Sequence, residues 1–283
     1  MQRQTIIHIT SKHCNMRKLF VILASFFSLG VSAQELFVFT EPASNMPARS
    51  LGVRDMNAFM FEKDGRLNYH NMPELMWGIN KKWMVHVQSF ISNRQEGGLE
   101  AEGGSFYAKY RFLSKDDIQS HFRMAAYGRY SFNNADIHQQ EIETMGHNTG
   151  YELGIIGTQL LHKVAISSSI SYERALDNND YKFPTTESNN AMNYTLSVGK
   201  LMLPKVYKNY KQTNMNLMLE LLGQRLNGNG KSYLDIAPSV QFIINSQARV
   251  DIGYRQELYS TMQRTAPNGI VLKLEYTFFN AFK

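Results

Sequence analysis

The feature that most restricts the fold of this chain is an alternation of residue types near its C-terminus. Between residues 248 and 282, apolar side chains recur at alternate positions along two runs: Val250, Ile252, Tyr254 and Leu258, and then Ile270, Leu272, Leu274, Tyr276 and Phe278. Charged side chains occupy positions between them: Arg249, Asp251, Arg255, Glu257, Lys273 and Glu275. A period of two residues predicts a hairpin of β-strands with one dry and one wet face. The dry face packs on a core in a soluble sheet, whereas in a closed membrane barrel it meets lipid and the wet face lines the lumen.

The lengths of the strands distinguish these two architectures. We expect twelve strands, at residues 51–61, 66–79, 82–92, 103–114, 119–132, 149–161, 163–175, 191–203, 213–226, 231–244, 248–260 and 268–280. Strands of globular proteins usually have about 5–6 residues, whereas a tilted membrane-spanning strand needs ~9–11. These strands of 11 to 14 residues therefore favour a twelve-stranded antiparallel transmembrane β-barrel.

The connections between the strands alternate in length and composition. The first, third and later odd-numbered connections are mostly longer and richer in Gly, Asn and acidic residues, as in residues 133–148 and 176–190. The even-numbered connections are mostly tight, such as Asn80-Lys81 and His162, and residues 204–212 are the exception. Outer-membrane barrels have long outer loops, short periplasmic turns and an even number of strands. The connections thus support the barrel independently of the alternation.

The first 33 residues read as a secretory signal peptide. Met16-Arg17-Lys18 precedes an apolar run over residues 19–29, and the small residues before Gln34 form a cleavage pattern. No comparable apolar run precedes Met16, so we expect translation to start there. Residues 34–50 form a polar lead-in, expected in the periplasm or plugging the near end of the lumen, and residues 51–283 form the barrel.

Charge and cysteine content restrict the partners of the mature chain. Without residues 1–33 the chain keeps 26 basic and 24 acidic side chains, so its net charge falls from +6 to +2. No basic stripe with interleaved aromatic residues is left, and a nucleic-acid partner is therefore not expected. The single cysteine, Cys14, lies in the leader, which excludes disulfides in the mature protein. No later segment has the ~18 apolar residues of a spanning helix.

Aromatic residues lie near the expected strand ends. Trp77 and Trp83 flank the turn at Asn80, and Phe112 and Phe278 lie at comparable inner ends. Tyr130, Phe132, Tyr172 and Tyr259 lie towards outer ends. Rings at these heights are expected to form two girdles at the membrane interfaces.

Charged residues on the lumen parity are grouped by sign. Basic residues come from the fourth and fifth strands: Lys109, Arg111, Arg123 and Arg129. Acidic residues come from the sixth, seventh, ninth and tenth: Glu152, Glu173, Glu220 and Asp235. Facing walls of opposite charge would orient dipolar solutes in an open lumen. The alternative is a closed interior in which these charges pair with one another.

The third outer loop contains the candidates for a metal site. His138, Glu141 and His147 lie there with Asp136, Glu143 and Met145, and such ligands suit zinc or copper. Their spacing matches no compact metal motif. A solvated polar loop without a metal therefore stays open as the other interpretation.

An enzyme is the rival class of function. A rim hydrolase would need a nucleophile beside a histidine, and the nearest pattern, His147-Asn148-Thr149-Gly150, has Thr in place of Ser. The glycines at 97–98 and 103–104 do not open a helix, so no phosphate-binding loop is expected. We predict no enzymatic activity and no cofactor.

The leader ending in Ser32-Ala33-Gln34, the opening residues 35–47 and the aromatic ending resemble a group of outer-membrane barrels from Bacteroidota. In length and layout the chain is also similar to transporter-like barrels linked to phenol-degradation pathways. The strand ending Tyr276-Thr277-Phe278-Phe279 resembles the terminal strand by which barrels are recognised for insertion, which implies the barrel-assembly machinery as a partner.

These resemblances imply a Gram-negative outer membrane and its lipid bilayer. The expected function is a narrow channel or transporter for small solutes with a charged lumen. The alternative is a closed barrel whose outer loops bind a metal or a partner.

Overall fold

The computed structural model describes residues 37–63, 65–94, 98–118, 120–206 and 211–282. The expected leader, residues 1 to 33, lies outside them. The described strands are β1 (Ser50–Phe61), β2 (Leu67–Gly78), β3 (Trp83–Ser92), β4 (Glu100–Asp117), β5 (Ser120–Asn133), β6 (Gly150–Leu161), β7 (Val164–Ala175), β8 (Asn190–Leu203), β9 (Asn214–Leu226), β10 (Ser232–Ile244), β11 (Ala248–Ser260) and β12 (Asn268–Phe278). All twelve predicted strands are confirmed, with ends within three residues of the prediction.

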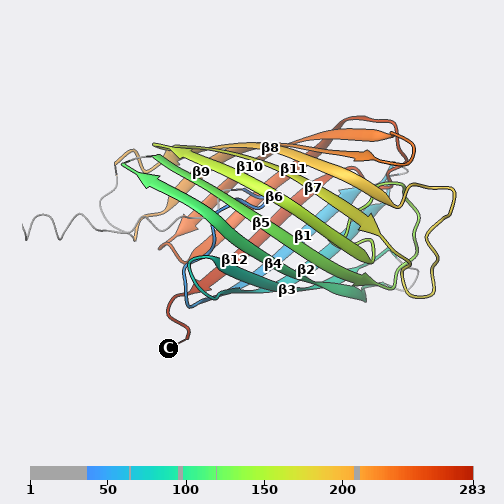
Figure 1. Cartoon of the computed structure of the whole chain (residues 1–283), viewed down its shortest axis with the longest axis horizontal. Helices are drawn as coiled ribbons and strands as arrows, with labels where there is room; N and C mark the ends of the chain where they lie inside the picture. The colour runs from blue at the N-terminus through green and yellow to red at the C-terminus, as the bar shows by residue number, and fades with distance from the viewer. Residues whose placement is uncertain (1–36, 64, 95–97, 119, 207–210, 283) are drawn as a thin grey trace, which may run out of the picture. The chain divides into compact units, whose positions relative to one another are not determined.

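The strands form one closed antiparallel barrel. Each strand pairs with its neighbours in sequence, and β12 returns to pair with β1, so that the sheet has no free edge (Figure 1). Closure satisfies the strand backbone internally, which a membrane requires. The predicted fold class is therefore confirmed.

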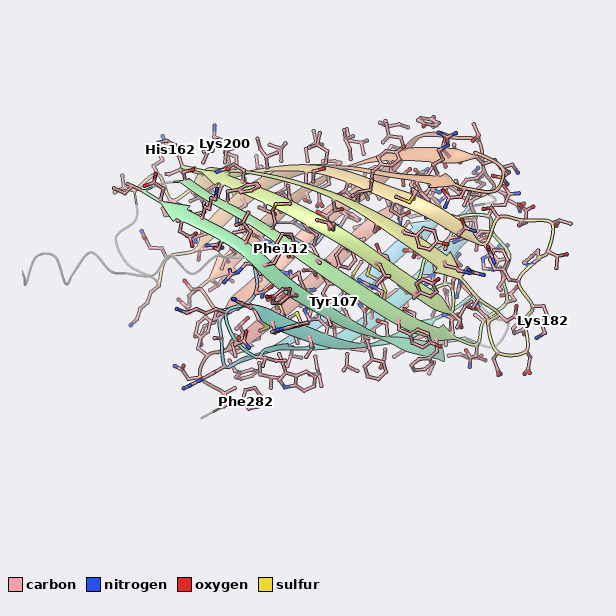
Figure 2. The ribbon with its side chains drawn as sticks, in the orientation of Figure 1. Tyr107, Phe112, His162, Lys182, Lys200 and Phe282 are labelled. Carbon is pink, nitrogen blue, oxygen red and sulfur yellow. The ribbon has the colours of Figure 1, made fainter. Side chains whose placement is uncertain are left out.

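Alternating side chains give the barrel an apolar outside. On β6, the side chains of Leu153 and Ile155 face outward and are 58% and 49% exposed. The side chain of Ile156 faces the lumen and is 1% exposed. Exposed large apolar side chains occur on every strand and project from the outer surface (Figure 2). Exposure of so much apolar surface is unfavourable in water and favourable in lipid. The barrel therefore spans a membrane, and its fold is that of outer-membrane proteins. No helix among the described residues is long and apolar enough to span a membrane.

The two ends of the barrel differ in their connections. Both ends of the strand series, Ser50 and Phe278, lie at the end with mostly short connections, which we call the inner end. One of these short connections contains Asn245 and Ser246 with φ of 53° and 57°, as a type I′ hairpin turn requires. The other end, with longer connections such as residues 134–149 and 176–189, is the outer end.

The predicted girdle residues lie near the inner end, on the outward side of their strands: Trp77, Trp83, Phe112 and Phe278. Trp77 and Phe278 both pair with Leu51, and the Trp83 ring lies 4.7 Å from that of Tyr110. Their contact with the membrane interface remains a prediction.

Two prolines interrupt the strand ladders. The missing ladder donor at Pro238 predicts a bulge or a local kink there. The β10–β11 ladder omits Ala237 and Pro238, but its register shift lies at Leu234/Asp235 and not at Pro238. Pro73 lies in the middle of β2, and the β2–β3 ladder omits Met72 and Pro73. Proline has no N–H for the ladder, which explains both gaps.

Candidate functional site

The segment before β1 enters the barrel from the inner end and binds to its wall. We call residues 37–49 the N-terminal plug. The Glu220 carboxylate, on β9, accepts hydrogen bonds from the backbone N–H groups of Val38 (2.9 Å), Phe39 (3.0 Å) and Thr40 (2.9 Å). Phe37 and Val38 are buried in an apolar cluster with strand residues such as Met56. Of the two positions expected for residues 34–50, the described part lies in the lumen.

A second group of contacts binds the other half of the N-terminal plug. The Lys109 ammonium donates to the carbonyls of Pro42 (2.8 Å) and Ser44 (2.9 Å) and lies 3.4 Å from the Glu41 carboxylate. The Ala43 N–H donates to the Thr158 hydroxyl at 2.9 Å. Burial opposes the charged form of Glu41, but Lys109 and then Arg54 hold the pKa of Glu41 well below its ordinary value. The plug is therefore bound through specific charged and polar contacts.

The third outer loop folds into the lumen from the opposite end. We call residues 134–149 the outer plug. Its Ile142 is buried, and the Ile142 backbone N–H and C=O form hydrogen bonds of 2.9 and 2.7 Å with the Gln224 amide. The Thr144 N–H donates to the Glu173 carboxylate at 2.6 Å. Two strand side chains thus bind the backbone of the loop, as Glu220 does for the N-terminal plug.

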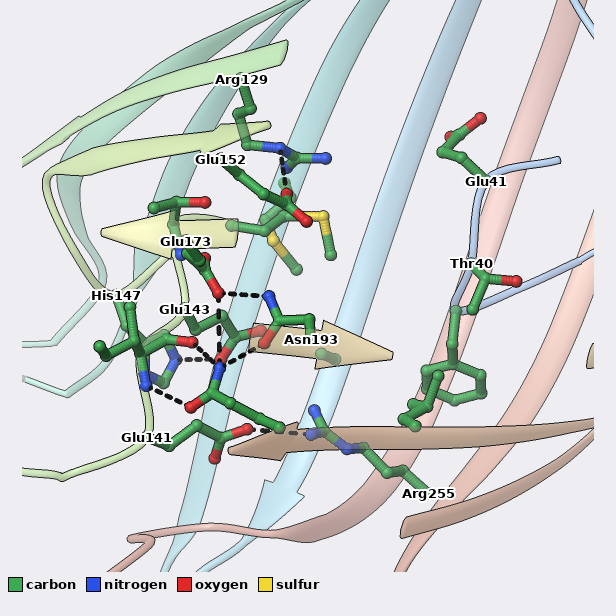
Figure 3. A pocket seen from close by; sticks show the side chains of 18 of the residues that line it. Thr40, Glu41, Arg129, Glu141, Glu143, His147, Glu152, Glu173, Asn193 and Arg255 are labelled. Carbon is green, nitrogen blue, oxygen red and sulfur yellow. Dashed lines mark hydrogen bonds and ion pairs between the residues drawn. The ribbon is translucent and has the colours of Figure 1, made fainter. Parts of the chain in front are cut away.

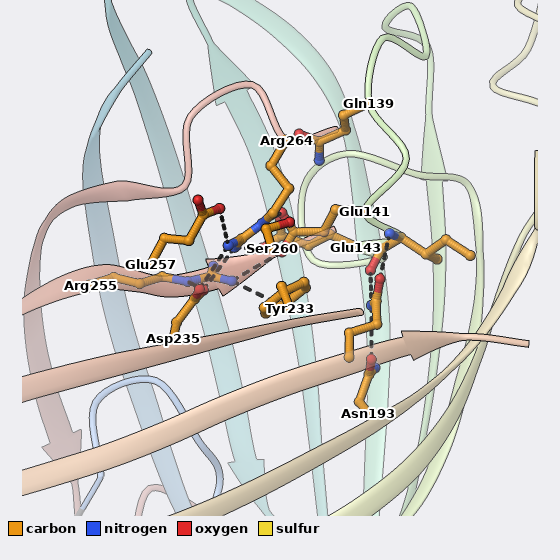
Figure 4. A network of polar contacts seen from close by, with 12 residues as sticks. Gln139, Glu141, Glu143, Asn193, Tyr233, Asp235, Arg255, Glu257, Ser260 and Arg264 are labelled. Atoms are coloured by element: carbon orange, nitrogen blue, oxygen red, sulfur yellow. Dashed lines mark hydrogen bonds and ion pairs between the residues drawn. The ribbon is translucent and has the colours of Figure 1, made fainter. Parts of the chain in front are cut away.

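An outer ion network connects the outer plug to the last outer loop. Glu141 of the plug lies 2.7 Å from Arg264 and 3.0 Å from Arg255 (Figure 4). The same two arginines contact Asp235 of β10 at 2.7 and 2.6 Å. Although burial raises the pKa of Glu141, Arg264 and Arg255 together lower it to about 2. The Arg264 guanidinium also lies 3.8 Å from the centre of the Tyr233 ring, a cation–π distance.

An inner ion network includes Glu41 of the N-terminal plug. Arg54 of β1 contacts three carboxylates, those of Glu74 (2.9 Å), Glu275 (2.9 Å) and Glu41 (3.2 Å). His86 lies 2.6 Å from Glu74. Apart from Glu41, these residues come from β1, β2, β3 and β12, outside the strands that were predicted to carry the two walls of opposite charge.

A cavity of about 250 Å³ lies between the two plugs. In Figure 3, Thr40 and Glu41 lie on one side of it and Glu143 and His147 on the other. Its charged lining comprises six carboxylic acids and four bases: Glu41, Glu74, Glu141, Glu143, Glu152, Glu173, Arg54, Arg129, Arg255 and Lys273. A methionine wall of Met56, Met60, Met72 and Met145 completes one side.

The eight predicted lumen residues have local partners. Arg129 lies 3.8 Å from Glu152 on the neighbouring strand, whereas Lys109, Glu220, Glu173 and Asp235 contact the plugs or the outer ion network. At the inner end, Arg111 donates to the Lys81 carbonyl (2.6 Å), and Arg123 lies 3.0 Å from Asp116. These contacts fit the alternative of an interior in which the charges pair with one another. That opposite walls orient dipolar solutes stays a prediction.

The candidate metal ligands are not brought together. Glu141 is neutralised by two arginines, His138 lies 3.5 Å from Asp136, and His147 shares a hydrogen bond of 2.8 Å with Gln139. Within the described residues, no three His, Cys, Asp or Glu side chains form a group that could bind a metal ion.

Arg264 is the residue that sequence reasoning missed most clearly. It lies in a short connection assigned to the outside, yet its side chain is fully buried in the lumen. Loop residues have no period, so parity cannot reveal which of them turn inward. The signal that could have indicated Arg264 is the excess of carboxylates on the lumen side of β6 to β10, because buried carboxylates need basic partners.

Comparison with known proteins finds a likeness in fold. No protein-family model and no curated protein sequence matches this chain. An outer-membrane channel from Pseudomonas putida F1 has a TM-score of 0.54 at 10% identity, covering 85% of this chain and 99% of the channel. This chain has the fold of an outer-membrane channel. The KdgM porin has a TM-score of 0.47 at 9% identity, covering 81% of this chain and 99% of the porin, and the NanC porin 0.46 at 12%, covering 81% and 98%.

Proposed function

We propose that the protein is a gated channel of the outer membrane that passes small polar solutes. The observation that carries the proposal is the arrangement of the lumen, in which two chain segments enclose a cavity from opposite ends. A barrel that is only a solid membrane anchor would fill its interior with wall side chains. Segments bound through hydrogen bonds and ion pairs can leave the lumen without any change in the strand ladders.

The charges of the cavity define the preferred solutes. Passage requires both plugs to leave the lumen, and Glu41, Glu141 and Glu143 leave with them. The wall of the cavity keeps three carboxylic acids against four bases, a formal charge of +1: Glu74, Glu152, Glu173, Arg54, Arg129, Arg255 and Lys273. A narrow passage lined in this way favours charged and dipolar solutes over apolar ones, and its excess positive charge favours anions over cations. We therefore propose weak anion selectivity.

A second class of solute is supported by the methionine wall. Thioether side chains adapt to apolar and aromatic groups. The chain resembles phenol-pathway transporter-like barrels in length and layout only, so the proposal of aromatic solutes rests on Met56, Met60 and Met72, which would contact them in the cavity. Phenol is therefore the appropriate second test solute.

We propose no hydrolytic role for the outer rim. The Thr149 hydroxyl donates to the Asn133 carbonyl at 3.1 Å, and the Nδ1 atom of His147 is engaged with Gln139. Neither group is arranged as nucleophile or base for the other.

The aromatic residues at and just after the end of β12 are a second candidate for recognition. Phe278 and Phe279 are exposed, and we propose that the barrel-assembly machinery recognises them during insertion.

Reconstituted protein in planar bilayers tests the proposed function. Under a gradient of potassium chloride, the reversal potential should indicate anion preference, and Arg129→Gln/Lys273→Gln should reduce it. The exposed variant Lys182→Gln serves as the matched control, because Lys182 lies in an outer loop. Proteoliposome uptake of glycine, choline and phenol then compares the solute classes. A correctly folded barrel with no uptake and no current would contradict the proposal.

A further inference from the structure

A cluster of polar side chains lies on the outside of the barrel, where its neighbours are apolar. Asp55 and Asn57 of β1 and Tyr69 and Asn71 of β2 alternate with the buried lumen residues Arg54, Met56, His70 and Met72. We call these four outward residues the β1–β2 polar patch. Asp55 pairs with Leu274 of β12 on one side and with Pro73 of β2 on the other.

The patch lies at mid-height of the barrel wall. Asp55 is five residues from the first residue of β1 and six from the last. Other outward charged side chains in the described strands, including Arg174, Lys200 and Arg225, lie within three residues of a strand end, where they can reach the membrane surface. A carboxylate and two amides at the centre of the hydrocarbon layer are unfavourable against lipid tails.

The hydrogen bonds within the patch leave groups that can bind a partner. The Asn71 amide donates to Asp55 (2.7 Å) and Asn57 (3.1 Å), the Asn57 amide donates to Asp55 (2.8 Å), and the Tyr69 hydroxyl donates to Asn57 (2.6 Å). One N–H of Asn57 and the carbonyl of Asn71 have no further contact within this cluster, and each Asp55 oxygen can accept another hydrogen bond. The patch therefore offers a donor and several acceptors to the outside.

The wall beside the patch has an interrupted ladder. The β2–β3 pairing omits Met72 and Pro73 of β2 and therefore skips Ser89 and Phe90 of β3. Ser89 is exposed on the outside. Polar groups and a gap in strand pairing thus coincide on one sector of the barrel, since the gap includes Pro73, the partner of Asp55 on β2.

We infer that the β1–β2 polar patch is the interface through which two copies of this chain associate side by side in the membrane. Both copies cross the membrane in the same direction, so a twofold axis along the membrane normal brings groups of equal depth together. The N–H of Asn57 in one copy can then donate to the carboxylate or carbonyl acceptors of the other copy. The apolar residues around the patch, including Val53, Leu75 and Leu274, would pack against their equivalents and exclude lipid.

Cysteine cross-linking in proteoliposomes tests this interface. In a chain with Cys14→Ser, Val53→Cys and Leu75→Cys probe the patch, while Leu196→Cys and Leu219→Cys on β8 and β9 are controls with nearly equal exposure, 42–43% against 46%. A short bismaleimide should link two copies at the patch at least several-fold more than at the controls. Equal linking at both sites, or none at the patch, would overturn the inference.

A second variant tests whether cross-linking at Val53→Cys depends on the polar side chains of the patch or arises from chance encounters of two copies. Asp55→Leu/Asn71→Leu makes the sector apolar without a change in the lumen, and folding can be checked by circular dichroism. We expect cross-linking at Val53→Cys to fall to the level of the controls in this background. Unchanged linking would contradict a role for the patch, and linking in cell membranes to a different protein in place of a second copy would overturn the choice of partner.

Discussion

Arg264 and Glu220 illustrate how single side chains fix the plugs. Arg264 provides charge to three carboxylates from separate segments, those of Glu141, Asp235 and Glu257. Glu220 provides acceptors to three consecutive backbone N–H groups. In both cases the partner left behind by a substitution would be buried without compensation, which makes the loss larger than the strength of one contact.

Substitution of Arg264 should strongly weaken the outer end. Arg264→Met leaves the buried carboxylates of Glu141 and Asp235 with Arg255 alone, and we expect a loss of about 3–5 kcal/mol in the free energy of unfolding. Denaturant unfolding in detergent measures it, and Arg264→Lys should recover part of the loss. Lys182→Met is the control, because its ion pair with Asp177 is exposed and such pairs contribute about 0–1 kcal/mol. Equal losses in Arg264→Met and Lys182→Met would refute the network.

Substitution of Glu220 should release the first residues of the N-terminal plug. Glu220→Leu removes the acceptor of the Val38, Phe39 and Thr40 amides, and an unsatisfied buried group costs about 1–3 kcal/mol. Exchange of these three amides with solvent should accelerate by about 10- to 100-fold. Glu102→Gln is the matched control, since Glu102 is buried with Arg94 and does not contact the plug. Unchanged protection in Glu220→Leu would show that apolar packing alone holds the segment.

At the level of elements, sequence was sufficient for the strands, left two positions open for the N-terminal plug and did not predict the outer plug. Each strand alternates inward and outward side chains over ten or more residues, so an error of register would expose many residues at once. This explains why β11, Ala248–Ser260, could be predicted to the residue. Residues 134–149 follow no period, and their insertion depends on the shape of a lumen that only the closed barrel creates. The inward parity of Lys109 and Glu220 was predictable, but their binding to the plug was not.

Docking of the outer plug should depend on pH through the protonation of Glu143 and His147. Burial and then Glu141 raise the pKa of Glu143 from 4.5 to about 7, while burial and then Arg94 lower the pKa of His147 well below 6.5. Between pH 4.5 and 6.5, Glu143 holds its proton in the docked plug and His147 gains one in the released plug, so the two contributions oppose each other. Above 6.5 only Glu143 still releases a proton, and docking should weaken as pH rises through about 7.

Limited proteolysis of the outer plug between pH 5 and 8 measures this dependence. One proton changes the docking constant by at most about tenfold per pH unit. In Glu143→Gln only His147 remains, so docking should strengthen up to about pH 6.5 and then stay constant. Asp180→Asn, in the neighbouring outer loop, should behave as wild type. Cleavage above pH 6.5 that increases equally in Glu143→Gln and wild type would contradict the assignment to Glu143.

At the level of the whole molecule, the barrel is a fixed wall around two independent closures. The strands pair only with one another, since β12 pairs directly with β1, and the plugs add backbone bonds to strand residues only at their ends, such as Arg49 with Gly78 and Asn134 with Glu102. The plugs bind mainly through side chains of β4, β7 and β9, with Arg264 at the outer end. Release of either plug should therefore leave the barrel intact, and passage requires both to move.

Single-channel conductance of variants that release each plug tests this account most directly. Glu220→Leu/Lys109→Leu removes the main contacts of the N-terminal plug without a change in net charge. Deletion of residues 136–146 removes the outer plug and leaves Asp235 and Glu257 to pair with Arg255 and Arg264. Wild type should conduct in rare, small events, each single release should raise the open time, and the combined variant should give a large steady conductance. A folded combined variant that conducts no more than wild type would contradict the claim that the plugs close a passage.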